Sequence, residues 1–81
     1  MHVTKPEASA ILERIFREVF EDDRLVLSPK MSREDLPAWD SLGHIRLIGA
    51  MEESFELTFT IDEIEKMSSV DRILDVLANR S

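Results

Sequence analysis

Apolar residues in the first quarter of the chain recur at the spacing of one face of an α-helix. These positions are Ile11, Leu12, Ile15, Phe16, Val19 and Phe20. Charged residues such as Glu13 and Arg17 lie between them, so the pattern predicts an amphipathic helix over about residues 5–21. Thr4 and Glu7 fit a capping box at its start. Such a helix needs other elements against which to bury its apolar face.

A second helix is expected to start at Asp40 or Ser41 and to end near Phe55. Asp40 is a good N-cap, because its carboxylate can accept hydrogen bonds from the free amides of the first turn. The apolar positions of this helix are Leu42, Ile45, Leu47, Ile48, Met51 and Phe55. They predict the face that the helix turns to the core.

The last third of the chain has a weaker pattern. Residues 58–61 alternate like a strand, but a single strand would have no partner, so we interpret them as a connector. A short helix is expected over about residues 61–67, and Ser68 or Ser69 caps a final helix. The apolar face of that final helix is Val70, Ile73, Leu74 and Leu77.

Residues 21–39 form a long connection without a sustained period, interrupted by Pro29 and Pro37. Spaced apolar residues are expected to hold it on the core: Leu25, Leu27, Met31, Leu36 and Trp39. Residues 32–35 are expected to form one helical turn. With only two glycines, a small β-barrel is disfavoured. We therefore predict one all-α domain over residues 1–81, a small bundle of three longer helices plus one short helix, with the long loop between helices one and two.

Composition narrows the possible partners. The formal net charge is −7, which disfavours binding to nucleic acids and anionic membranes. The chain has no cysteine, and its apolar runs are too short for a signal peptide or a membrane span. We expect a cytoplasmic protein, a monomer, with partners that carry basic docking surfaces.

Most signatures of catalytic or metal sites are missing. The histidines, His2 and His44, match no metal motif, and no stretch has the glycines of a P-loop. Ser41 and His44 are three residues apart on one predicted helix, so they could form a nucleophile–base pair. Such a pair would lack an orienting acid and an oxyanion hole, and an exposed, solvated His44 is the simpler interpretation. We expect no catalytic residue and no metal site.

Acidic residues gather late in the chain, at Glu52, Glu53, Glu56, Asp62, Glu63 and Glu65. They could form a docking strip for a basic partner, or simply a solvated face that keeps the protein soluble. Charge alone does not choose between these interpretations.

The segment from Leu36 to Glu53 resembles the acyl carrier protein family. In that family an Asp-Ser-Leu triplet begins the second helix of a small acidic bundle, and here Asp40, Ser41 and Leu42 stand at that point. The similarity continues without a gap through the second helix, the acidic segment 62–67 and the Ser-Val start of the last helix. The first helix and the long loop match in pattern only.

The resemblance implies that Ser41 is esterified with 4′-phosphopantetheine, taken from coenzyme A by a magnesium-dependent phosphopantetheinyl transferase. The thiol of this cofactor would hold acyl groups as thioesters and present them to acyl-loading and acyl-processing enzymes. Asp40 would cap the helix and help the transferase read the site, and Leu42 would help to seat the base of the arm. The position of Ser41 agrees with this role, because a helix N-terminus favours a phosphodiester anion.

Some residues depart from the family pattern. Gly43 and His44 follow the triplet, Arg46 brings a positive charge, and Gly49 stands where a bulky apolar contact residue is common. Each glycine costs about 1 kcal/mol of helix stability relative to alanine. We expect Arg46 to contribute to docking, and a dedicated partner set in a specialised lipid or polyketide-type pathway fits better than housekeeping fatty-acid synthesis.

Three alternatives stay open at this stage. A peptidyl or aminoacyl carrier would share the chemistry but not the cargo, and a helical adaptor would bind a basic partner without any cofactor. A small hydrolase that uses Ser41 and His44 is the third. The cargo itself could be sequestered in a cleft lined by Ile45, Phe59, Ile61 and Ile64, although these residues could equally form plain core.

Overall fold

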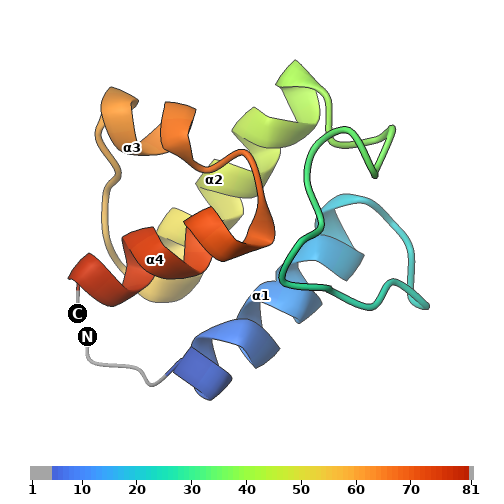
Figure 1. The fold of residues 1–81 in the computed structure, drawn as a ribbon, viewed down its shortest axis with the longest axis horizontal. Helices are drawn as coiled ribbons and strands as arrows, with labels where there is room; N and C mark the ends of the chain where they lie inside the picture. Colours follow the sequence, from blue (N-terminus) through green and yellow to red (C-terminus); the bar gives the residue numbers. More distant parts are fainter. Residues whose placement is uncertain (1–4, 81) are drawn as a thin grey trace.

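The computed structural model describes residues 5–80 and arranges them in four helices without a strand (Figure 1). The helices are α1 (Lys5–Val19), α2 (Ser41–Phe55), α3 (Ile61–Lys66) and α4 (Val70–Arg80). α1 packs against α2 and α4, and α3 packs against α4. The predicted all-α bundle with one short helix is confirmed. Thr4, part of the expected capping box of α1, lies outside the described residues.

α1 ends at Val19, slightly earlier than the sequence pattern predicts. Glu21 adopts a left-handed conformation with φ of 52°, which a right-handed helix does not contain. The amide of Asp22 donates to the carbonyl of Arg17 at 3.0 Å, so a backbone hydrogen bond closes the helix end. Phe20 therefore lies outside the helix, although its side chain still packs against the core.

The core lies between the helices and the long loop. Its buried apolar residues are Ala8, Leu12, Ile15, Phe16, Leu25, Trp39, Leu47, Ile48, Met51, Phe55, Phe59, Met67, Val70, Ile73, Leu74, Val76 and Leu77. The loop supplies the largest of them, Trp39, which is 1% exposed. Its ring meets Phe16 of α1 edge-on, with centroids 5.1 Å apart. The expectation that spaced apolar residues hold the loop on the core is confirmed, since Leu27, Met31 and Leu36 also pack against it.

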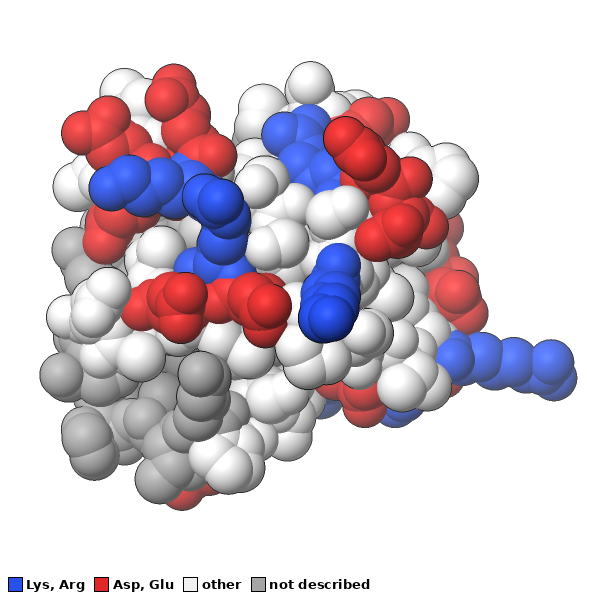
Figure 2. Space-filling view, viewed as in Figure 1, with Lys and Arg blue, Asp and Glu red and all other residues white. Residues whose placement is uncertain are grey.

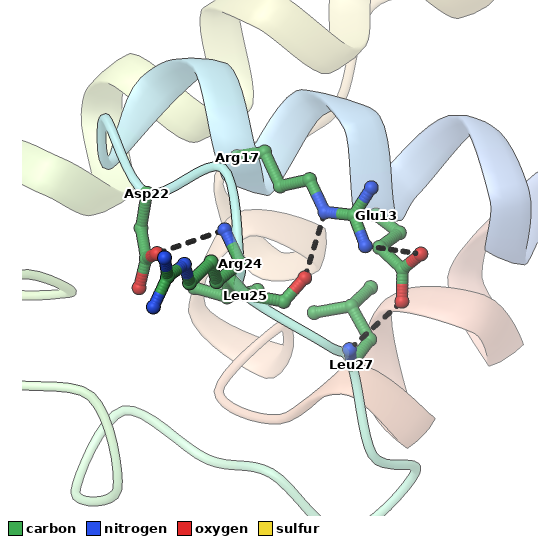
Figure 3. Close-up of polar contacts among 6 residues, drawn as sticks. All are labelled: Glu13, Arg17, Asp22, Arg24, Leu25 and Leu27. Atoms are coloured by element: carbon green, nitrogen blue, oxygen red, sulfur yellow. Dashed lines mark hydrogen bonds and ion pairs between the residues drawn. The ribbon is translucent and has the colours of Figure 1, made fainter.

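Polar groups of α1 fix the first half of the loop (Figure 3). The guanidinium of Arg17 donates through Nε to the carbonyl of Leu25 at 2.8 Å. Glu13 forms an ion pair with Arg17 at 3.2 Å, and its Oε2 accepts from the amide of Leu27 at 3.0 Å. These contacts satisfy backbone groups that would otherwise lie unpaired in the loop.

The second half of the loop lies against the start of α4. The amide of Val70 donates to the carbonyl of Met31 at 2.9 Å, and that of Asp71 to the carbonyl of Pro29 at 3.0 Å. Loop carbonyls therefore satisfy amides of the first turn of α4. The hydroxyl of Ser69 accepts from the amide of Arg72 at 3.4 Å, which confirms Ser69 as the cap.

Residues 32–35 form a tight turn closed by a hydrogen bond between its ends, and not the turn of helix that the sequence suggested. The amide of Asp35 donates to the carbonyl of Ser32 at 3.0 Å, and the carboxylate of Asp35 accepts in return from the amide of Ser32. Ser32 also forms an isolated antiparallel bridge with Ser69. The side-chain hydrogen bond of Asp35 favours this local turn over a helix.

The core face of α2 differs from the expected one. Leu42 and Ile45 are 59% and 67% exposed, so placing them in the core was wrong. The buried residues of α2 are Gly43, His44, Leu47, Ile48, Met51 and Phe55. Their spacing is that of a helical face that begins at a glycine and a histidine, residues that a purely apolar pattern overlooks.

α3 is short and has no buried residue of its own. Thr60 and Glu63 form a reciprocal capping box at its start. The core residues that flank it, Phe59 and Met67, hold its two ends on the bundle. Residues 57–60 form no strand, so the interpretation of this segment as a connector is confirmed.

Candidate functional site

Ser41 is the first residue of α2, and its side chain is exposed. Asp40 precedes it in an extended conformation, and its Oδ1 accepts from the amide of Gly43 at 2.8 Å. The predicted N-cap is therefore confirmed. Other amides of this turn have no acceptor inside the helix, and the first turn contains no acidic residue. An anion attached to Ser41 would be stabilised by these amides and by the helix dipole.

Gly43 allows the start of α2 to approach the loop that precedes it. A Cβ at this position would lie 2.3 Å from the carbonyl oxygen of Ala38 and 2.9 Å from Cε1 of Phe20. Such distances are far shorter than ordinary van der Waals contact. Because glycine alone fits, this residue fixes the start of α2 against the loop and the end of α1. The sequence showed only its cost to helix propensity.

His44 is buried, with 7% of its surface exposed, so the expectation of a solvated histidine was wrong. Its Nδ1 accepts from the indole Nε1 of Trp39 at 2.9 Å. Its Nε2 lies 2.9 Å from the carbonyl oxygen of Ile64 in α3. A neutral imidazole with its proton on Nε2 satisfies both partners at once. The spacing of His44 to Leu47, Ile48 and Met51 is the sequence signal that places it on the core face.

The buried position of His44 removes the hydrolase alternative. Both of its ring nitrogens are occupied by Trp39 and Ile64, so neither is available as a base for Ser41. Within the described residues, no group of three or more His, Asp or Glu side chains is placed to hold a metal ion. None of the helices over residues 5–80 is both long enough and apolar enough to cross a membrane.

The surface around Ser41 combines exposed apolar residues with charges of both signs, since Asp40 and Glu21 are exposed there as well as Arg46. Leu42 and Ile45 are exposed large apolar residues, and Arg46 is exposed on the next turn. A depression of about 280 Å³ lies beside them, between the end of α1, the loop and the start of α2. Leu42 and Arg46 line its α2 side. Further along α2, a side chain at Gly49 would meet nothing within 4 Å.

The acidic residues considered for docking fall into two groups. Glu52 and Glu63 are half-buried and have structural partners, since Glu52 Oε2 accepts from the amide of Phe59 and Glu63 closes the capping box of α3. The second group, Glu53, Glu56, Asp62 and Glu65, is exposed. Figure 2 shows acidic side chains gathered over α3 with basic side chains among them, so this part of the surface carries mixed charge.

The four residues considered for a cargo cleft do not surround one interior space. Ile45 and Ile61 are 67% and 75% exposed, Phe59 belongs to the core, and Ile64 is half-buried against it. Of the two alternatives that the sequence left open, a cleft and plain core, neither therefore holds for Ile45 and Ile61 in this structure. Their exposure adds them instead to the apolar surface on the side of α2 and α3.

Comparisons with known proteins identify the family. No protein-family model matches the sequence. An acyl carrier protein from Buchnera aphidicola subsp. Acyrthosiphon pisum is 32% identical over 75 residues, which is 88% of this chain and 92% of the relative. One from Thermosynechococcus vestitus is 36% identical over 76 residues, 89% of this chain and 93% of the relative. The chain belongs to the acyl carrier protein family.

A solved structure agrees with this family assignment. The solution NMR structure of holo acyl carrier protein from Geobacter metallireducens superimposes with a TM-score of 0.80 at 37% identity. The match covers 86% of this chain and 80% of the other. The family resemblance that the sequence indicated is confirmed over most of the chain.

Proposed function

We propose that this carrier bears 4′-phosphopantetheine on Ser41, holds acyl intermediates on it as thioesters, and presents them to partner enzymes. The observation that carries the proposal is the placement of Ser41, an exposed hydroxyl at the first position of a capped helix in a chain of this family. The bound cofactor would supply a thiol, which the chain lacks because it has no cysteine. The protein would then act as substrate and shuttle for other enzymes.

Attachment requires little chemistry from the chain itself. The Ser41 hydroxyl would attack the phosphorus of coenzyme A that carries pantetheine, forming an ester bond and displacing the 3′,5′-ADP part. The hydroxyl proton would pass to a base of the phosphopantetheinyl transferase, since His44 is engaged elsewhere. The first-turn amides of α2 that have no acceptor inside the helix favour the phosphodiester anion that results. Asp40 would keep those amides in place by capping the helix.

A matched pair of serine variants tests this proposal. The protein is incubated with a fluorescent coenzyme A analogue, Mg²⁺ and a promiscuous phosphopantetheinyl transferase. We expect label on the wild type and on Ser54→Ala, an exposed serine on the same helix, but none on Ser41→Ala. A folded wild type that takes no label would overturn the proposal and favour a cofactor-free adaptor.

We also propose that the carrier serves a dedicated set of enzymes in a specialised lipid or polyketide-type pathway, with Arg46, Glu53, Glu56 and Asp62 in docking. The support is the exposed positive charge of Arg46 and the open surface at Gly49, on the helix that begins with Ser41. Enzymes of housekeeping fatty-acid synthesis should therefore elongate its cargo poorly. Elongation as fast as on a housekeeping carrier would refute this part. If the chain were instead a peptidyl or aminoacyl carrier, an amino-acid-activating enzyme would load an amino acid onto it.

A further inference from the structure

α3 is held to α2 by few contacts, and His44 makes one of them. α3 contributes no buried residue, and its closest helix partner is α4. At its start, the Phe59 amide donates to Glu52 of α2 at 2.9 Å. Near its end, the carbonyl of Ile64 accepts from Nε2 of His44 at 2.9 Å. These two side-chain contacts fix both ends of the α3 segment to α2.

The histidine also satisfies a backbone need of α3. Ile64 lies in the last turn of a six-residue helix, where the carbonyl groups have no amide further along the helix to donate to them. Its carbonyl receives only a long backbone hydrogen bond, from the amide of Met67 at 3.3 Å. The imidazole supplies a second, shorter donor, so His44 acts as a side-chain cap for the end of α3.

The opposite side of the same ring is held by the loop that leads to Ser41. Trp39 donates to Nδ1 of His44, and its own ring is fixed edge-on by Phe16 of α1. Trp39 lies two residues before Ser41, and His44 lies one helical turn after it. A single imidazole therefore connects the loop before Ser41, the helix that begins at Ser41, and α3.

The exposed apolar residues lie directly beside this connection. Ile45 follows His44 on α2, and Ile61 lies one turn before Ile64 on α3. With Leu42, they are the exposed large apolar residues of these two helices. The placement of Ile61 relative to Leu42 and Ile45 depends on where α3 lies, and so on the hydrogen bond of His44.

We propose that His44 is a positioning residue: it sets the position of α3 relative to the attachment end of α2, and with it the two-helix surface that enzymes meet when they approach Ser41. This inference rests on the proposed function, because it assigns the surface to enzymes that act at Ser41. It requires no proton transfer by His44 and no change of its hydrogen bonds during turnover.

Two amide variants separate the two hydrogen bonds of the ring. In His44→Asn, the side-chain oxygen can replace Nδ1 toward Trp39, while nothing reaches Ile64. In His44→Gln, the side-chain NH₂ can replace Nε2 and donate to Ile64. We expect exchange protection of the α3 amides, read against α1 amides, to fall between about two- and tenfold in His44→Asn, the weight of one hydrogen bond. In His44→Gln it should stay near the wild-type value.

The kinetic test uses the phosphopantetheinyl transferase as probe. We expect the KM for the carrier to rise in His44→Asn by no more than the factor by which exchange protection falls, with little change in kcat, because KM follows only the fraction of molecules in which α3 is in place; His44→Gln should restore it. The indole NMR signal of Trp39, the sole tryptophan, should stay near its wild-type position in His44→Asn. Equal KM values for all three proteins, with the wild type modified normally, would overturn the inference alone. An unmodified wild type would instead refute the proposed function, while α3 exchange would still test the position of the helix. If His44→Asn unfolds, His44→Gln decides by the same readouts: α3 protection and KM should both stay near the wild-type values or both change, and a change in one without the other would overturn the inference.

Discussion

Replacing Gly43 by alanine should destabilise the protein, although alanine is the better helix former. In a helix interior this change gains up to about 1 kcal/mol of propensity. Here the added Cβ would lie 2.3 Å from the carbonyl oxygen of Ala38, which is backbone and cannot rotate away. It would also press on Phe20 and lie 3.3 Å from Oδ1 of Asp40. Overpacking of this kind costs roughly 1–3 kcal/mol, occasionally more, so after the propensity gain we expect a net loss of up to about 2 kcal/mol.

Gly49 provides the matched control on the same helix. No atom lies within 4 Å of the Cβ that alanine would add there, so only the propensity gain of about 1 kcal/mol remains. Because the propensity gain is common to both variants, they should differ by the overpacking cost, roughly 1–3 kcal/mol in the free energy of unfolding. Urea denaturation followed by circular dichroism measures both values.

The outcome bears on the site as well as on stability. Neither glycine has a positive φ, so backbone strain cannot explain a difference between the variants. Because Gly43 donates to the capping carboxylate of Asp40, Gly43→Ala should also slow the modification of Ser41. Equal stability of Gly43→Ala and Gly49→Ala would refute the close approach of α2 to the loop.

Further variants test single contacts. Asp40→Ala should cost about 1 kcal/mol of stability through loss of the N-cap, and Asp40→Asn should restore most of it in the same denaturation assay. Glu13→Ala removes the acceptor of the Leu27 amide and should cost no more than about 1 kcal/mol, while hydrogen exchange at Leu27 becomes faster; unchanged exchange there would contradict the contact. Glu53→Lys should raise the KM of a basic partner enzyme for the carrier and make that KM less dependent on salt. Glu52→Gln should chiefly lower the stability of the carrier. The reverse pattern would contradict our division of the acidic residues.

The helices were predictable because their apolar spacing agrees with their caps. Ser41 to Phe55 was placed correctly from the Asp40 cap and the recurring apolar residues. The short helix was expected over about residues 61–67 and spans Ile61–Lys66, but its threonine cap, Thr60, was not foreseen. The role of Trp39 was also foreseen as a loop residue that packs on the core. In these cases local and tertiary preferences point to the same structure.

The face of α2 was not predictable from apolar residues alone. A buried histidine normally has hydrogen-bond partners for its ring nitrogens. Those of His44 are Trp39, in the loop before α2, and Ile64, which is twenty residues away in α3, so a local pattern does not contain them. The need for glycine at position 43 depends on the path of the loop, which no local pattern encodes. The structural role of Glu52 likewise depends on where the connector after α2 returns.

The most direct test of the account is to measure the intact mass of the protein after each step of modification and loading. Wild type and Ser41→Ala are each treated with coenzyme A, Mg²⁺ and transferase, then with an acyl donor and its loading enzyme, then with hydroxylamine. The account predicts that the wild type alone gains one phosphopantetheine, then one acyl group, and that hydroxylamine removes only the acyl group because it is a thioester. A folded wild type without any gain in mass, or an equal gain in Ser41→Ala, would contradict it.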